Sequence, residues 1–134
     1  MSFTTEGLTW LLNQIDDPLY IGLIGETGYD EDVGLSADDT MASHAGWAEL
    51  TDYDEATRPQ WSYGTAANKL LTADAVTMTF NASVTVKGYF ITTDSTKGGS
   101  SGTLLVTRLF TSGDRSYTDD ETIALTNILK GAGG

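Results

Sequence analysis

The second half of the chain alternates apolar and polar residues with a period of two, the pattern of β-strands that bury one face. The alternating segments span residues 76–80, 84–91, 104–110 and 123–129. Short polar or glycine-containing segments separate them, so the sequence predicts a mainly β chain that folds as an antiparallel β-sandwich. In the second segment, we expect Val84, Val86, Gly88 and Phe90 to share one face.

The first half is less regular. Leu8, Leu11, Leu12 and Ile15 have the spacing of one helix face, which predicts a short N-terminal α-helix over about residues 5–16. Asp16-Asp17-Pro18 would end this helix. Residues 19–24 are apolar at both strand faces and predict a buried strand. Gly, Asp, Glu and Thr then predict a long acidic loop over about residues 25–39.

Composition limits the possible partners. The chain has 134 residues, no cysteine and a formal charge of −12, so we expect a single domain over 1–134 without disulfides, with a flexible C-terminal end at about 130–134. The negative charge argues against binding to nucleic acid or to an anionic membrane. No apolar run approaches the ~20 residues of a membrane span, and the first six residues lack the basic start of a signal peptide. We therefore expect synthesis in a cytoplasm.

Catalytic chemistry has little support in the sequence. His44 is the single histidine, so a multi-histidine metal site is excluded and no cysteine can complement it. No G-x-S-x-G nucleophile elbow accompanies the many Ser and Asp residues. We expect a protein that is not an enzyme and has no cofactor.

Acidic clusters leave two alternatives open. Paired carboxylates can hydrolyse glycosidic bonds or bind calcium when their geometry is fixed. The segment that starts at Asp30 fails as a calcium loop, because its twelfth position is Met41 rather than Glu. The simpler interpretation is that these side chains are solvated loop charges.

Aromatic and basic residues gather in the irregular segment 41–63. Tyr53, Arg58 and Trp61 are the residue types that dominate protein interfaces, Pro59 favours an extended conformation, and Trp47 lies nearby. We predict that these five residues contact a partner. The alternatives are that the aromatic rings fill the core and that Arg58 pairs locally with Asp54 or Glu55.

Four stretches of the sequence resemble a family of small virion structural proteins of tailed bacteriophages. They are GLTWLL at residues 7–12, LYIGL at 19–23, ELTDYDEATRPQW at 49–61 and STKGGSSGTLL at 95–105. They occur in the family's order and span nearly the whole chain. The resemblance implies a capsid decoration, or cement, protein without catalytic residues.

The resemblance also implies the partners and the location. We expect the chain to bind the major capsid protein or another virion protein, and to stabilise the assembled head at the capsid surface. A cyclic homo-oligomer would match a symmetric lattice, and a trimer is expected by analogy alone. Two alternatives stay open, namely a tail or head fibre component that contacts host glycans and a glycan hydrolase with paired carboxylates.

Overall fold

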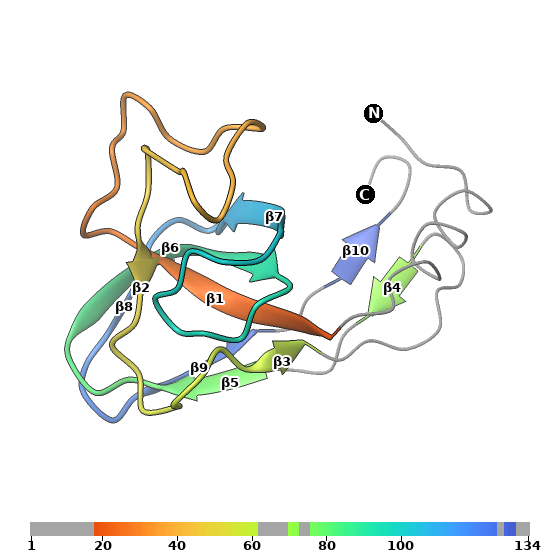
Figure 1. Ribbon diagram of the computed structural model, residues 1–134. Coiled ribbons are helices and arrows are strands. Elements are labelled where there is room, and N and C mark those ends of the chain that lie inside the picture. The colour runs from red at the N-terminus through yellow and green to blue at the C-terminus, as the bar shows by residue number, and fades with distance from the viewer. Residues whose placement is uncertain (1–17, 62–69, 73–75, 126–127, 131–134) are drawn as a thin grey trace.

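The computed structural model describes residues 18–61, 70–72, 76–125 and 128–130 of the chain. The described part is mainly β, with antiparallel sheets and no helix (Figure 1). The predicted mainly β class is therefore confirmed. The helix expected over residues 5–16 and nearly all of the expected C-terminal end at 130–134 lie outside the described residues.

The described residues form ten strands. Their bounds are β1 Leu19–Gly25, β2 Glu49–Leu50, β3 Gln60–Trp61, β4 Leu70–Thr72, β5 Val76–Thr79, β6 Val84–Thr92, β7 Leu104–Leu109, β8 Arg115–Tyr117, β9 Thr122–Leu125 and β10 Ile128–Lys130. The strands predicted at 19–24, 76–80, 84–91 and 104–110 correspond to β1, β5, β6 and β7. The segment predicted as one final strand at 123–129 corresponds instead to β9 and β10, which belong to different sheets.

The largest sheet is built on β1 and β6, which pair along most of their length. The two short strands β2 and β3 pair with the other edge of β1, one after the other. In the same way, β7 and β8 divide the outer edge of β6. Pro59 lies directly before β3, on the β1 side of the sheet, and an edge position suits a residue without an N–H. Its carbonyl accepts a hydrogen bond from the N–H of Ile21. Each outer edge of the sheet therefore consists of two short pieces.

A second antiparallel pair, β5 and β9, contributes to the same core as the large sheet. Residues 80–83 join β5 to β6, but these two strands do not pair with each other. Apolar side chains from both sheets form one buried cluster, which contains Leu19, Ile21, Leu23, Leu50, Tyr53, Trp61, Val76, Met78, Phe80, Val86, Ile91, Ile123 and Leu125. The shared cluster means that burial of apolar area holds the two sheets together.

The opposite face of β1 is also buried, as its apolar sequence predicts. Ile24 packs there with Phe90 of β6 and with Met41 and Trp47, which come from the long connection between β1 and β2. This connection, at the top of Figure 1, includes the acidic loop expected over 25–39. Its apolar residues cover the outer face of the sheet, while its acidic side chains lie mostly at the surface.

A β-bulge in β6 changes the faces that simple alternation predicts. Ile24 pairs with Gly88 and Gly25 pairs with Val86, so Lys87 is an extra residue on β6. Beyond the bulge the alternation is shifted by one residue. Val86 therefore lies in the first cluster and Phe90 in the second, and the prediction that they share a face is wrong.

Candidate functional site

The side chains predicted to contact a partner lie mostly in the interior. Trp47, Tyr53, Arg58 and Trp61 are all buried, and Pro59 is half-buried. Tyr53 and Trp61 belong to the first cluster, and Trp47 belongs to the second. In this conformation the three rings fill the core, which is the alternative that the sequence left open. The contact of these residues with a partner stays a prediction.

Arg58 lies at the centre of a buried hydrogen-bond network. Its Nε and Nη2 atoms donate to the two carboxylate oxygens of Glu49, at 2.9 and 2.6 Å. Nη1 donates to the carbonyl of Asp94 at 2.8 Å, and Nη2 also donates to the carbonyl of Gly99 at 2.9 Å. The partner of Arg58 is therefore Glu49, and the alternative of a local pair with Asp54 or Glu55 is not what the structure shows. This network ties the 49–58 segment to the 93–102 loop.

Lys97 extends the same connection. Its ammonium group donates to the carbonyls of Tyr53 and Glu55, each at 2.8 Å, and lies 4.3 Å from the centroid of the Tyr53 ring. The Tyr53 hydroxyl is buried and has no hydrogen-bond partner among the described residues. Burial raises the pKa of this hydroxyl, and the nearby charge of Glu49 raises it further. Tyr53 therefore stays neutral at physiological pH.

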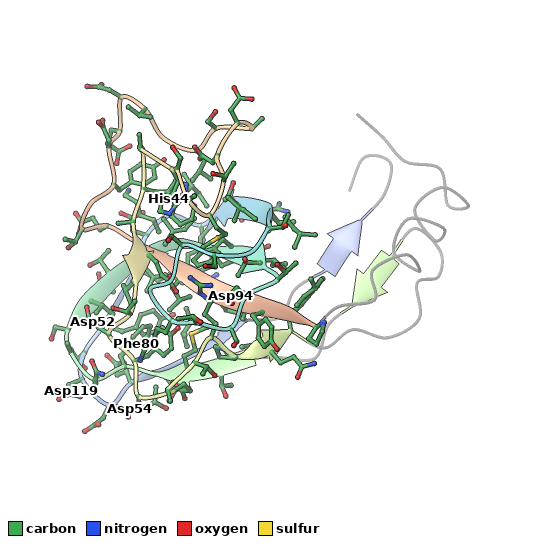
Figure 2. The ribbon with its side chains drawn as sticks, viewed as in Figure 1. His44, Asp52, Asp54, Phe80, Asp94 and Asp119 are labelled. Carbon is green, nitrogen blue, oxygen red and sulfur yellow. The ribbon has the colours of Figure 1, made fainter. Side chains whose placement is uncertain are left out.

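His44 lies in the loop that covers the sheet, where it packs against neighbouring residues (Figure 2). Its ring stacks on Trp47 with a centroid separation of 3.8 Å, and Nδ1 is 2.9 Å from the Trp47 carbonyl. The Trp47 indole N–H donates to the Asp39 carboxylate at 3.0 Å. Within the described ranges, no three His, Cys, Asp or Glu side chains lie close enough together to hold a metal ion.

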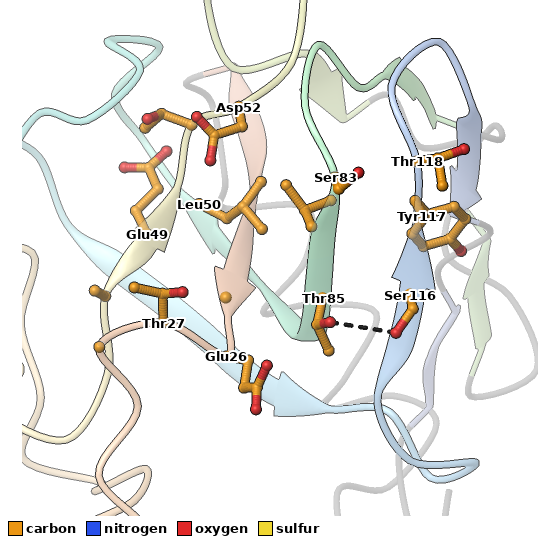
Figure 3. Close-up of a pocket in the computed structure, with 15 residues that line it drawn as sticks. Glu26, Thr27, Glu49, Leu50, Asp52, Ser83, Thr85, Ser116, Tyr117 and Thr118 are labelled. Carbon is orange, nitrogen blue, oxygen red and sulfur yellow. Dashed lines mark hydrogen bonds between the residues drawn. The ribbon is translucent and has the colours of Figure 1, made fainter.

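A groove with a volume of about 670 Å³ opens beside the point where β1 ends (Figure 3). Its lining comes from four segments, residues 25–28, 48–52, 83–85 and 116–118. The segments place Glu49, Leu50 and Asp52 on one side and the β6–β8 pair on the other. Bending of the chain after Gly25 creates this space, because β6 and β8 continue past the last residue of β1.

Ten of the fifteen residues that line the groove have polar side chains, and some of these are already bonded within the protein. Thr85 and Ser116 lie opposite each other on β6 and β8, with 3.2 Å between their hydroxyl oxygens. The Thr118 hydroxyl donates to Glu121 at 2.7 Å. Glu49 accepts from Arg58 and from the N–H of Gly98. These bonds hold the walls of the groove in place.

A second set of polar side chains in the groove has no hydrogen-bond partner within the part of the chain that the structure describes. It consists of two carboxylates and three hydroxyl groups, from Glu26, Asp52, Thr27, Thr51 and Ser83. Lys and Arg are absent from the described residues that line the groove. The groove therefore offers hydrogen-bonding groups to a ligand and carries negative charge.

The outer edge of β7 is a second exposed feature. In the described part of the chain, β7 pairs with β6 and with no other strand. Leu105 and Leu109 are 42% and 37% exposed, and Arg108 between them is also exposed. Leu105 is the extra residue of a bulge, because Ile91 pairs with Val106 and Thr92 pairs with Leu104. The regular part of the open edge therefore runs from Val106 to Leu109.

Sequence patterns contain a single indication of the groove. Its hydroxyl residues come from segments far apart in the chain, and each is an ordinary strand or turn residue by itself. Glu49 was likewise not predicted as the partner of Arg58, although it begins the ELTDYDEATRPQW stretch that contains this arginine. The alternating Thr and Ser residues at 83–85 and 116–118 are the one signal, since they mark the polar face of two strands.

Comparisons with known proteins add no family assignment. No protein-family model, no curated protein and no solved structure matches this chain. Over the described residues, no helix is long and apolar enough to cross a membrane.

Proposed function

We propose that the chain is a bacteriophage virion structural protein, a capsid decoration protein that binds and stabilises the assembled head. It acts without catalysis or a cofactor, by attaching to the major capsid protein or to another virion protein. The resemblance of its four sequence stretches to small virion proteins supports this role. The structural observation that carries the proposal is the open edge of β7.

The edge of β7 has the composition of a contact surface. Its exposed Leu105 and Leu109 offer apolar area, and its outer edge, which pairs with no other described strand, offers backbone groups to a strand of a partner. The strand contains Arg108 and no acidic residue, although the whole chain carries a formal charge of −12. A neutral or acidic protein surface can therefore approach at this edge with less repulsion than at the acidic loops.

The rest of the fold fits a passive binding module. We propose that the two sheets form a β-sandwich around their shared cluster, which gives the β7 edge a rigid support. The bulge at Leu105 restricts the edge available for pairing and so limits uncontrolled edge-to-edge association. Many weakly bound copies on one shell then gain affinity by multivalency, and a trimer would match a symmetric shell.

Quantification of the chain on purified phage particles tests the proposal. Arg108→Glu and Leu109→Glu should each lower the number of copies per particle, because they place negative charge at the contact. Val33→Glu is the matched control, since Val33 is 52% exposed in the acidic loop, outside β7. Thermal melts of the three variants should resemble that of the wild type.

The outcomes separate the alternatives. Absence of the chain from particles would overturn the virion role, and unchanged occupancy of both β7 variants would overturn the β7 contact. Hundreds of copies per particle are expected for a decoration protein, whereas a fibre component would be present in a handful. Turnover of a cell-wall or capsular glycan, lost in Asp-to-Asn variants, would instead support a hydrolase.

A further inference from the structure

We propose that the groove between the 48–52 segment and the β6–β8 pair binds a neutral oligosaccharide. This activity is separate from attachment at β7 and does not depend on it. The groove lies beside the end of β1, whereas β7 pairs with the part of β6 beyond the bulge.

The chemistry of the lining matches sugar hydroxyl groups. A sugar hydroxyl both donates and accepts hydrogen bonds, so it pairs equally with carboxylates, which accept, and with Ser or Thr, which do both. The groove presents both types, because Glu26, Asp52, Thr27, Thr51 and Ser83 have no partner among the described residues. Water satisfies these groups in the free protein, and a polyol can replace that water with equivalent bonds.

Charge argues against anionic ligands. Phosphates, sulfates and acidic sugars bind most strongly to cationic partners, and the described residues that line the groove include no Lys or Arg. The net charge of −12 adds a long-range repulsion of anions. A bound metal ion is not supported either, since the described residues contain no group of three ligand side chains.

The size and shape of the groove favour a chain of sugars over a single ring. A volume of about 670 Å³ lies within the usual range of small-molecule sites, which is roughly 300–1,000 Å³. Glu26 and Asp52 lie at opposite ends of the groove (Figure 3), so a ligand that extends along the groove passes both carboxylates. Successive residues of an oligosaccharide can bond to the two carboxylates in turn.

The walls are fixed before any ligand binds. Glu49 is held by two hydrogen bonds from Arg58, which positions the 48–52 side. The Thr85–Ser116 contact joins β6 and β8 on the other side, as the dashed line in Figure 3 shows. A site that is ordered in advance loses less entropy on binding, which favours recognition of a weakly interacting polyol.

NMR titration of the whole chain tests the inference. The probes are linear oligomers of glucose, galactose, mannose and N-acetylglucosamine, from one to six residues long. At least one series should shift the backbone amide signals of residues 25–28, 48–52, 83–85 and 116–118. Affinity should rise with oligomer length, because a longer chain reaches both Glu26 and Asp52.

Two variants and a control connect the binding to the named side chains. Glu26→Gln and Asp52→Asn should each weaken the binding of the best probe by roughly tenfold, the usual effect of losing a charge-assisted hydrogen bond. Asp119→Asn is the control, since Asp119 is exposed and does not line the groove (Figure 2). Both variants change exposed carboxylates, so their melts should match the wild type.

Three results would overturn the inference. The first is that no probe shifts the groove signals at a concentration of about 20 mM, beyond the weakest range expected for a specific site. The second is that shifts occur only outside the four segments. The third is that a trilysine peptide shifts the groove signals while every sugar fails, which would assign the groove to a basic peptide.

Discussion

Removal of the Arg58 side chain should destabilise the fold strongly. Arg58 is 1% exposed and makes two hydrogen bonds to Glu49 and two to backbone carbonyls. Arg58→Ala leaves the Glu49 carboxylate buried with only the N–H of Gly98 as a donor. Breaking a buried ion pair from one side costs about 3–5 kcal/mol, because the remaining charge is uncompensated.

Thermal and urea unfolding measure this loss. For a chain of 134 residues, each 1 kcal/mol lowers the melting temperature by roughly 3–5 °C, so Arg58→Ala should melt about 10–20 °C below the wild type. Arg58→Lys should also be destabilised, because an ammonium group lacks the planar geometry that bonds both oxygens of Glu49.

A double variant distinguishes the buried charge from lost packing. In Arg58→Met with Glu49→Met, both charges are removed together and apolar atoms replace them. Since no unpaired charge remains, the double variant should be clearly more stable than Arg58→Ala. A loss below about 1 kcal/mol for Arg58→Ala would refute the reasoning, because that is the range of an exposed ion pair.

Two further predictions follow from single contacts. A Cβ atom at Gly22 would lie 2.2 Å from Cζ of Phe90, so Gly22→Ala should lower the free energy of unfolding by roughly 1–3 kcal/mol, measured by urea unfolding. Adding Phe90→Leu to Gly22→Ala should recover part of this loss, because the smaller side chain relieves the clash. Hydrogen bonds from the backbone N–H and hydroxyl of Thr118 hold the pKa of Glu121 below its ordinary value. The Glu121 carboxylate therefore stabilises the fold above its unfolded-state pKa of about 4.3, and this contribution is lost as pH falls through the lower folded-state pKa. The free energy of unfolding of the wild type should exceed that of Glu121→Gln at about pH 7, and this difference should disappear as the pH falls to about 3. A difference that stays constant with pH would contradict the stabilising role of the Glu121 carboxylate.

Strand positions were predictable because alternation reports burial directly. The apolar run at 19–24 predicted a strand covered on both faces, and β1 is buried on both faces. The three-residue strand β8 was missed, since Arg115–Tyr117 is too short for a period of two to stand out. Which strands pair with each other could not be predicted from the sequence either. A short connection such as residues 80–83 is typical of a hairpin, but here it leads from one sheet to the other.

The bulge at Lys87 shows why a regular pattern can still give the wrong faces. Residues 84–87 alternate, but residues 89–91 are Tyr, Phe and Ile in succession, so their polarity does not show which of them face which side. Lys87 is the extra residue because Ile24 and Gly25, the last two residues of β1, pair with Gly88 and Val86. A Cβ atom on Gly88 would lie 2.0 Å from the Arg108 carbonyl oxygen, so this glycine permits close approach of β7 next to the bulge.

The aromatic and basic residues of the 47–61 segment could not be placed from their types alone. Tyr, Trp and Arg are common both in interfaces and in the interior, and the deciding factor here is a buried acidic partner for Arg58. Glu49 supplies it from nine residues away, together with carbonyls of Asp94 and Gly99 that only the folded chain brings near.

Glu49 also connects the stability of the core to the groove. The Glu49 carboxylate both lines the groove and accepts the hydrogen bonds of Arg58. The position of the 48–52 segment in the groove therefore depends on this ion pair. Variants at Arg58 should therefore weaken sugar binding without touching the ligand, and the loss should appear at temperatures well below their melting points. Variants at Glu26 and Asp52 should weaken binding without lowering the melting temperature. The two classes of variant thus separate a ligand contact from the support that positions it.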